Sequence, residues 1–370
     1  MTSKTLNDGF HEYLDNIKVT QKVKDTLEDV RIKVRHALTE GIGAETEKEG
    51  QRIRPRFMTQ GSARYKTQNM PCNPPKQQID YDYGCYLPLS YHEDDGSCKP
   101  QKAAKDFFDI VGGILSRLAS QHKGWKYEEH KKCCRLVVSE DIHFDVPLYS
   151  VPDKELKTIR DSRVALESVG AFSQSDSADQ EEKDLEWKDL PTESIMLAEN
   201  DGENHYSWRA SDPRLLNVYF EGKSDDDHAI YRILKGWRDY NWQNGDGPSS
   251  IFLMSLAEKA CNKTGFSSDI ESELKDALRF IETCPLKNED NGLVSVENPA
   301  DSNDTIKCPE QEFQKLQQYA RGFRSAIVNS WASLTDVCVM AQSHLGGRFP
   351  ILSDVSTPNF REPPRTTRAG

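Results

Sequence analysis

The sequence has no apolar run of the length that a membrane-spanning helix needs. Such a helix takes about 18 or more apolar residues, and the longest candidates here, such as Ile251–Leu256, match one face of a helix. The first ten residues, MTSKTLNDGF, lack the apolar centre of a signal peptide. We therefore expect a cytoplasmic protein without membrane association.

Cysteine pairs with metal-binding spacing are also missing. The nine cysteines are scattered along the chain, and none of them forms a Cys-x-x-Cys pair. Cys133 and Cys134 are adjacent, a spacing that suits neither a zinc site nor a relaxed disulfide. These absences indicate reduced thiols, as in a cytoplasm.

An excess of positive charge is the third feature that is lacking. The chain has 48 Lys and Arg against 60 Asp and Glu, a formal net charge of −12. An acidic chain has no general attraction for nucleic acids or anionic membranes. A long polynucleotide substrate is therefore disfavoured, although a local basic pocket stays open. At 370 residues, 36% of them hydrophobic, the chain is long enough for about two domains with sizeable cores.

Helical periodicity is present at both ends of the chain. Apolar residues recur at helical spacing over residues 8–40, and Gly41 and Gly43 follow them. This pattern predicts one long helix that the glycines end. From Asp212 onward, a succession of periodic runs predicts a helical lobe.

The middle of the chain mixes helix and strand signals. Residues 103–118 have helical periodicity, whereas residues 133–139 and 142–151 are strand-like runs separated by a short acidic turn. Residues 173–192 are acidic and Ser-rich, which is typical of a solvated insertion. We expect a sheet flanked by helices.

The run QIDYDYGCY places Asp80 and Asp82 one residue apart among apolar and aromatic neighbours. In a strand, both carboxylates point to one face, and Ile79, Tyr81 and Tyr83 point to the other. Two adjacent like charges repel unless a cation neutralises them, and Mg²⁺ prefers carboxylate oxygens. The pattern favours a metal-binding strand, with an acidic surface turn as the alternative.

Upstream, QGSARY offers a turn that can hold phosphate. Gly61 lets backbone N–H groups approach a phosphate closely, and the hydroxyl of Ser62 adds a donor. Taken alone, Gly-Ser is equally typical of an ordinary helix cap. Followed by the aspartate pair, it indicates a triphosphate cradle beside a metal site.

A third acidic residue, Asp145, interrupts the apolar strand IHFDVPLY. A lone buried carboxylate is costly, so a shared metal is one interpretation, and a cap of the turn before Pro147 is the other. Three aspartates beside a Gly-Ser turn suit nucleotidyl transfer assisted by two metal ions. In that interpretation Asp145 lies nearest the attacking hydroxyl, as a metal ligand and proton acceptor.

These residues resemble a known signature. The pattern GS…IDYDYG…HFDVPLY resembles that of the DNA-polymerase-beta-type nucleotidyltransferases, and within them the DncV-like branch of the cGAS/DncV-like nucleotidyltransferases (CD-NTases). The stretches FMTQGSARYKTQN, SDPRL, LKGWRDYNW, GPSSIFLM and ENPADSND extend the resemblance along the chain. Seventeen residues separate Ser62 from Asp80, a longer gap than in the compact members of the superfamily, which the DncV-like branch tolerates.

The resemblance implies an α+β fold: a polymerase-beta-like nucleotidyltransferase core, with a mixed sheet flanked by helices and a long N-terminal helix, followed by a C-terminal helical lobe. The domains implied are an N-terminal helix on the core (1–50), a palm-like nucleotidyltransferase domain (51–210), the helical lobe (211–350) and a flexible tail (351–370).

It also implies roles for individual residues. Asp80, Asp82 and Asp145 would be the catalytic ligands of two Mg²⁺ ions. The residues implied to contact nucleotides are Gln60, Gly61, Ser62, Tyr65, Arg135, Ser211, Lys235, Ser250 and Asp304. Simpler structural roles stay open for several of them: a solvated strand or helix residue for Arg135 and Lys235, a helix cap for each serine, and a polar loop residue for Asp304.

The activity that the resemblance implies is cyclic dinucleotide synthesis from ATP and GTP, giving cyclic GMP-AMP for an effector in anti-phage signalling (CBASS). The zinc-binding insert and basic surface of the DNA-sensing relatives are missing, so no DNA partner is expected. Gly370 ends the tail RTTRAG, where the resemblance implies conjugation by a ubiquitin-activating and -conjugating-like partner. Base identity and linkage stay open.

Three other functions fit parts of the pattern. A primer-extending poly(A)- or CCA-type enzyme shares the three aspartates but needs a basic RNA groove. A glycosyltransferase can use Asp-x-Asp to hold the metal of a sugar nucleotide, although there the pair follows a nucleotide-binding domain. A non-catalytic module with the same fold is the third.

Overall fold

The computed structural model describes residues 4–90, 100, 102–154, 194–203, 205–264, 269–289, 291–328 and 331–353. The predicted acidic insertion at 173–192, Gly370 and nearly all of the predicted tail lie outside these residues. The chain forms two compact units. Unit 1 comprises Met1–Ile17, Pro248–Ser295 and Lys307–Gly370, and unit 2 comprises Lys18–Gly247 and Val296–Ile306. The predicted four-domain division stays a prediction.

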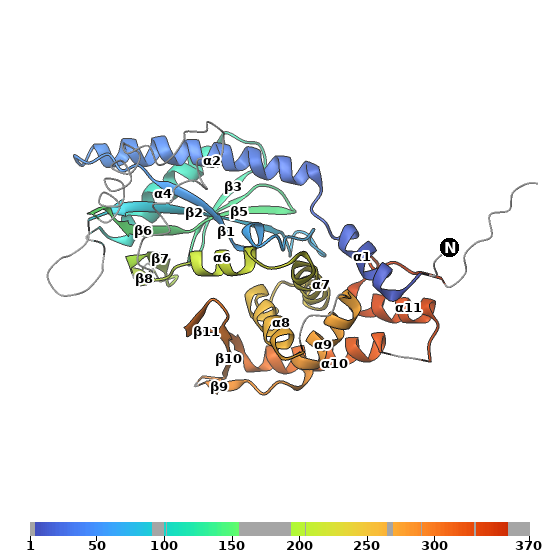
Figure 1. Ribbon diagram of the computed structural model, residues 1–370. Helices are drawn as coiled ribbons and strands as arrows, with labels where there is room; N and C mark the ends of the chain where they lie inside the picture. Colours follow the sequence, from blue (N-terminus) through green and yellow to red (C-terminus); the bar gives the residue numbers. More distant parts are fainter. Residues whose placement is uncertain are drawn as a thin grey trace, which may run out of the picture. The chain divides into compact units, whose positions relative to one another are not determined.

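Unit 2 carries the large sheet and the elements around it (Figure 1). Its helices are α2 (Gln21–Glu47), α3 (Gly61–Arg64), α4 (Ala104–Ser120), α6 (Arg214–Glu221) and α7 (Asp225–Asn241). Its strands are β1 (Arg56–Gln60), β2 (Ile79–Leu89), β3 (Lys126–Glu129), β4 (Cys134–Val137), β5 (Ile142–Val146), β6 (Leu148–Pro152), β7 (Met196–Asn200) and β8 (Tyr206–Ala210).

The sheet is mixed, with strand order β3-β4-β5-β2-β6-β7-β8 and β1 paired to β2. β2 runs parallel to β5 and β6 and antiparallel to β1. Helices α2 and α4 lie together over one face of the sheet (Figure 1). The core there joins Val34 and Leu38 of α2 and Phe107 of α4 to Tyr83 and Phe144 of the sheet. The predicted mixed sheet flanked by helices is confirmed.

Unit 1 is mainly helical. Its helices are α1 (Leu6–Asn16), α8 (Ser250–Thr264), α9 (Ile270–Thr283), α10 (Glu310–Ile327) and α11 (Leu334–Leu345). Phe10 and Tyr13 of α1 pack against the ring of Phe349, which anchors the N-terminal helix to the segment after α11. The helical C-terminal region is confirmed. No helix among the described residues has both the length and the apolar character to cross a membrane.

The predicted single helix over residues 8–40 is wrong. The structure has two helices, because the chain leaves the helix after Asn16, Lys18 forms a β-bridge with Asn69, and Thr20 caps α2 by accepting from the N–H of Val23. The predicted stop at the glycines is also wrong. α2 continues through Gly41 to Glu47, since the missing side chain there makes room for Ile114 of α4.

Two other predictions are corrected. The run predicted as one strand over residues 142–151 is two strands, β5 and β6, interrupted at Pro147, which has no N–H for a ladder hydrogen bond. The polar loop predicted around Asp304 is instead a hairpin in a three-stranded sheet. Its strands are β9 (Lys287–Glu289), β10 (Leu293–Asn298) and β11 (Asp301–Pro309).

Candidate active site

Two parallel strands at the middle of the large sheet bring the predicted carboxylates together. In the register of β2 and β5, Asp80 lies opposite His143 and Asp82 lies opposite Asp145. Alternate residues of these strands, Tyr83 and Phe144 among them, are buried under α2 and α4. Because side chains alternate along a strand, the aspartates point to the opposite face. The predicted strand geometry of QIDYDYGCY is confirmed.

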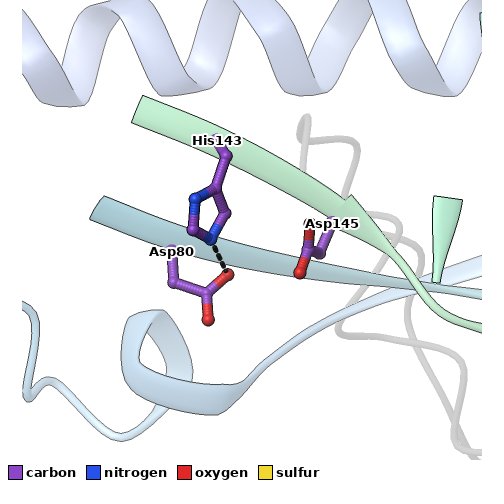
Figure 2. A group of neighbouring side chains, drawn as sticks. All are labelled: Asp80, His143 and Asp145. Carbon is purple, nitrogen blue, oxygen red and sulfur yellow. Dashed lines mark hydrogen bonds and ion pairs between the residues drawn. The ribbon is translucent and has the colours of Figure 1, made fainter. Parts of the chain in front are cut away.

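His143 connects the two strands at this site. Its Nε2 lies 2.9 Å from Oδ1 of Asp80, and its Nδ1 lies 3.1 Å from Oε1 of Gln78. The imidazole is only 11% exposed, whereas the carboxylate of Asp80 is 47% exposed. Figure 2 shows His143 and Asp145 on one strand, beside Asp80 on the next. His143 was not among the predicted site residues, although its spacing from Asp145 repeats that of the two aspartates on β2.

Arg135 holds Asp145 from the other side. Its Nε and one terminal nitrogen donate to the two carboxylate oxygens, both at 2.7 Å. Asp145 is 7% exposed and Arg135 21%, so this is a nearly buried bidentate pair that fixes the carboxylate in one orientation. Both residues come from neighbouring positions of β4 and β5.

The Gly-Ser turn packs directly against the aspartates. Gly61 has a φ of +64° and opens the short helix α3. A Cβ atom at this position would lie 2.1 Å from Oδ2 of Asp82. The Ser62 hydroxyl donates to the backbone oxygen of Asp80 at 3.4 Å. The turn and the aspartate strand therefore form one local structure.

Two further residues of the predicted donor loop are buried. The side chain of Gln60 is held between two tyrosines: its Nε2 donates to the hydroxyl of Tyr149 at 3.1 Å, and its Oε1 accepts from Tyr86 at 3.4 Å. Tyr65 packs its ring against Phe220 of α6, with centroids 5.4 Å apart. The buried contacts of Gln60 and Tyr65 thus hold the two ends of the Gly-Ser turn in place.

The neighbouring carboxylates of the cluster alter one another's pKa values. Burial, followed by the charges of Asp80 and Asp145, raises the pKa of Asp82 well above its usual range. Burial also acts to raise the pKa of Asp80, but the hydrogen bond and charge of His143 outweigh it and the pKa is lowered. Repulsion of this kind is relieved by a cation.

The donor set fits a metal ion. Asp80, His143 and Asp145 each present one ligand atom, and these atoms lie within 4.8 Å of one another. Carboxylate oxygens are the ligands that hard divalent cations prefer. With Asp82 repelled by two of these groups, the cluster can hold a divalent ion and would be stabilised by it.

Lys235, on α7, is the predicted phosphate contact that lies within electrostatic reach of the cluster. Burial lowers the pKa of this amine, while the carboxylates of Asp239, Asp80 and Asp82 act in the opposite sense. The chain between α3 and β2 fixes α7 there: Asn69 donates to the backbone oxygen of Arg232 at 2.8 Å, and Gln77 to that of Asp239 at 2.7 Å.

Ser211, a predicted contact in unit 2, ends the β7–β8 hairpin. Its N–H donates to the backbone oxygen of Ile195 at 3.1 Å. The next residue, Asp212, accepts from the N–H of Arg214 at 2.9 Å. Asp212 therefore serves the start of α6, and the cap proposed for Ser211 is not seen.

The last two predicted contacts lie in the C-terminal half. Ser250 is the first residue of α8 in unit 1, where the neighbouring Ser249 accepts from the N–H of Phe252. Ser249 is therefore the residue that caps the helix. Asp304 is an exposed residue of β11 and accepts from the amide of Asn298 at 3.0 Å.

Solved structures of other proteins share this fold. A Vibrio cholerae dinucleotide cyclase (DncV) in complex with GTP and 5MTHFGLU2 matches with a TM-score of 0.71 and 23% identity, covering 92% of this chain and 97% of that one. DncV cyclic AMP-GMP synthase of the same organism, in complex with a linear intermediate, pppA(3′,5′)pG, matches with a TM-score of 0.69 and 22% identity. It covers 92% of this chain and 96% of that one. The fold is that of a nucleotidyltransferase.

Sequence comparison then gives the family. The family model of the cyclic GMP-AMP synthase DncV-like nucleotidyltransferase domain matches residues 55–149. That of the cyclic GMP-AMP synthase C-terminal domain matches residues 226–345. Together the two domains account for more than half of the chain. The chain belongs to the DncV-like nucleotidyltransferases, as the resemblance predicted.

Two characterised relatives have the name cyclic GMP-AMP synthase. The protein of Vibrio cholerae serotype O1 is 33% identical over 239 residues, which are 62% of this chain and 52% of the relative. A protein of Escherichia coli is 29% identical over 300 residues, 79% of this chain and 64% of the relative. The matched part of the chain thus spans between half and two thirds of the length of these relatives.

Proposed function

We propose that this chain is a cyclic dinucleotide synthase that joins ATP and GTP into cyclic GMP-AMP by two successive nucleotidyl transfers. One observation carries the proposal: Asp80, Asp82 and Asp145 converge on one face of the sheet, directly against the Gly61–Ser62 turn. Such a juxtaposition suits triphosphate binding beside a divalent-cation site. The names of the relatives support the choice of product.

Each residue of the cluster has a distinct part in the proposal. Asp80, Asp82 and Asp145 would hold two Mg²⁺ ions, which when bound neutralise the triphosphate and acidify the attacking hydroxyl. Backbone N–H groups after Gly61 and the hydroxyl of Ser62 would hold the donor phosphates. Lys235 would add a point charge to the same phosphates. Arg135 fixes the orientation of Asp145, which would accept the proton of the attacking hydroxyl.

The remaining parts of the proposal rest on the resemblance. The cyclic product would act on an effector in anti-phage defence in a bacterial cytoplasm. Ser211, Ser250 and Asp304 would contact nucleotides, with Asp304 accepting from a guanine base. A ubiquitin-activating and -conjugating-like partner would join Gly370 to a target. Deleting Gly370 should leave synthesis unchanged and block conjugation; conjugation at the wild-type level would contradict this part.

The decisive experiment incubates the full chain with ATP, GTP, CTP and UTP and a divalent cation. Products are treated with phosphatase and identified by mass spectrometry. We expect a phosphatase-resistant cyclic dinucleotide that contains adenine and guanine. Elongation of an added RNA primer would instead support a poly(A)- or CCA-type enzyme. Absence of any phosphodiester product with all four nucleotides would count against catalysis.

A further inference from the structure

The ring of His143 is oriented by a short hydrogen-bond chain on the face of the sheet that carries the aspartates. The amide nitrogen of Gln78 donates to the backbone oxygen of Ser139 at 2.9 Å. A carbonyl oxygen only accepts, so this bond fixes which end of the Gln78 amide is nitrogen. Its oxygen, Oε1, therefore faces Nδ1 of His143 at 3.1 Å. Nδ1 must then carry a hydrogen, which it donates to Oε1.

This assignment gives Nε2 a specific role. The other ring nitrogen, Nε2, offers a lone pair to a metal ion whenever it carries no proton. This nitrogen lies 2.9 Å from Oδ1 of Asp80 (Figure 2), so a divalent ion bound by both atoms would take the place of the proton in their hydrogen bond. Two acceptors in contact need either a proton or a metal ion between them.

The surroundings of His143 are also those of a metal ligand. A histidine that binds metal nearly always donates its other ring N–H to an oxygen acceptor, which fixes the tautomer. Gln78 is that acceptor here. The ring is 11% exposed, and one of its nitrogens lies within 4.8 Å of a ligand atom of Asp80 and of one of Asp145.

We infer that Nε2 of His143 is a ligand of the divalent ion held by Asp80 and Asp145, and that the site consequently prefers Mn²⁺ to Mg²⁺. The inference rests on the proposed function only in taking this cluster as the ion site of the transfer reaction. Imidazole is a better ligand for first-row transition ions than for Mg²⁺, which favours an all-oxygen set. A mixed nitrogen and oxygen set therefore shifts selectivity towards Mn²⁺.

The test is pulsed EPR of Mn²⁺ bound to the full chain, alone and with a non-hydrolysable ATP analogue. We expect ¹⁴N modulation from a directly bound imidazole, which changes to the ¹⁵N pattern when the protein is labelled with ¹⁵N-histidine. His143→Asn should remove the modulation and weaken Mn²⁺ binding about tenfold or more, with a smaller change for Mg²⁺. His143→Asp should retain Mg²⁺ binding while the preference for Mn²⁺ is lost.

Two control variants separate a ligand from a residue that only orients Asp80. Gln78→Ala keeps the imidazole, so the nitrogen modulation should persist while Mn²⁺ affinity falls by about 10-fold. His205→Asn changes a histidine that is 75% exposed and should leave spectrum and affinity unchanged.

Three results would overturn the inference: no Mn²⁺ binding, bound Mn²⁺ without a histidine nitrogen signal in the wild type, or an unchanged signal in His143→Asn. The wild-type measurement decides even where a variant fails to fold. Because the spectrum requires no turnover, a chain that binds Mn²⁺ through His143 but makes no dinucleotide would refute the proposed function alone.

Discussion

The carboxylate of Asp82 lies where a side chain on residue 61 would begin: a Cβ atom on Gly61 would be 2.1 Å from Oδ2 of Asp82. Only a glycine leaves this space free. Gly61 also has a positive φ of 64°, which residues with a side chain adopt at a cost. The turn that would hold phosphate and the strand that would hold the metal ion are therefore matched to each other at a single position.

The variant Gly61→Ala should abolish dinucleotide synthesis, because the added methyl group must displace the Asp82 carboxylate or the turn. We also expect the free energy of unfolding to fall by about 1–2 kcal/mol from the left-handed backbone. Product formation is measured by mass spectrometry and stability by denaturant unfolding.

Gly124→Ala is the matched control for the backbone effect. Gly124 has a φ of +91°, but a Cβ atom added there would have no heavy atom within 4 Å among its non-neighbouring residues. This variant should lose similar stability and keep full synthesis. Equal activities in the two variants would show that the contact with Asp82 is unimportant.

Removal of divalent cations should destabilise unit 2, because three carboxylates then repel one another at one site. In EDTA the wild type should melt at a lower temperature than with saturating metal. A site occupied at 100 times its dissociation constant adds about 2.7 kcal/mol to the free energy of unfolding. Calorimetry with and without Mg²⁺ or Mn²⁺ measures this difference.

The double variant Asp80→Ala with Asp82→Ala is the control for the cation effect. It should make no product, remain folded and show little response to EDTA, since two of the three carboxylates are gone. In EDTA it should be more stable than the wild type, because the remaining carboxylate of Asp145 keeps its pairing with Arg135. An unaltered metal response in this variant would refute the assignment of the site.

The variant Arg135→Met should be strongly destabilising. It leaves Asp145, 7% exposed, without its bidentate partner, and breaking a buried pair in this way costs about 3–5 kcal/mol. The loss should be smaller with a divalent ion present, since the ion also neutralises Asp145. Arg135→Lys keeps the charge but not the planar fork, so an intermediate loss is expected.

Arg209→Met serves as its control. Arg209 also forms an ion pair from a strand of the same sheet, with Glu199, but it is 53% exposed. Exposed pairs contribute about 0–1 kcal/mol, so urea unfolding should detect little change. Similar losses for both arginines would mean that burial does not set the strength of the Asp145 pair.

The sequence predicts the carboxylates of the site well because strand periodicity alone determines which side chains share a face. Asp80 and Asp82 stand two apart in one strand, and the buried residues that alternate with them, Ile79 and Tyr83, mark the opposite face. The register between strands is different: it is set by tertiary pairing. That His143 lies opposite Asp80 follows from the parallel pairing of β2 and β5, which no local pattern specifies.

The helical predictions failed where tertiary contacts override local preference. Ile17 and Val19 are buried and continue the apolar pattern across the break between α1 and α2, so periodicity alone could not locate it. Glycines are common helix stops, yet Gly41 lies inside α2. The need for a glycine at this position is explained only by the close approach of α4, a helix that begins at Ala104, far along the chain.

The packing of these two helices yields the final prediction. A Cβ atom on Gly41 would lie 2.6 Å from Cδ1 of Ile114, a residue that is 4% exposed in the core beneath α2 and α4. Gly41→Ala should therefore lower the free energy of unfolding by about 1–3 kcal/mol, the usual cost of overpacking. In contrast, Gly113→Ala within α4 meets no atom closer than 3.7 Å and should stabilise the protein by about 0.5–1 kcal/mol through helix propensity.

Adding Ile114→Ala to Gly41→Ala removes the clashing atoms, so the double variant should be more stable than the sum of the two single losses predicts. Strict additivity in urea unfolding would show that α2 and α4 do not meet at these two residues.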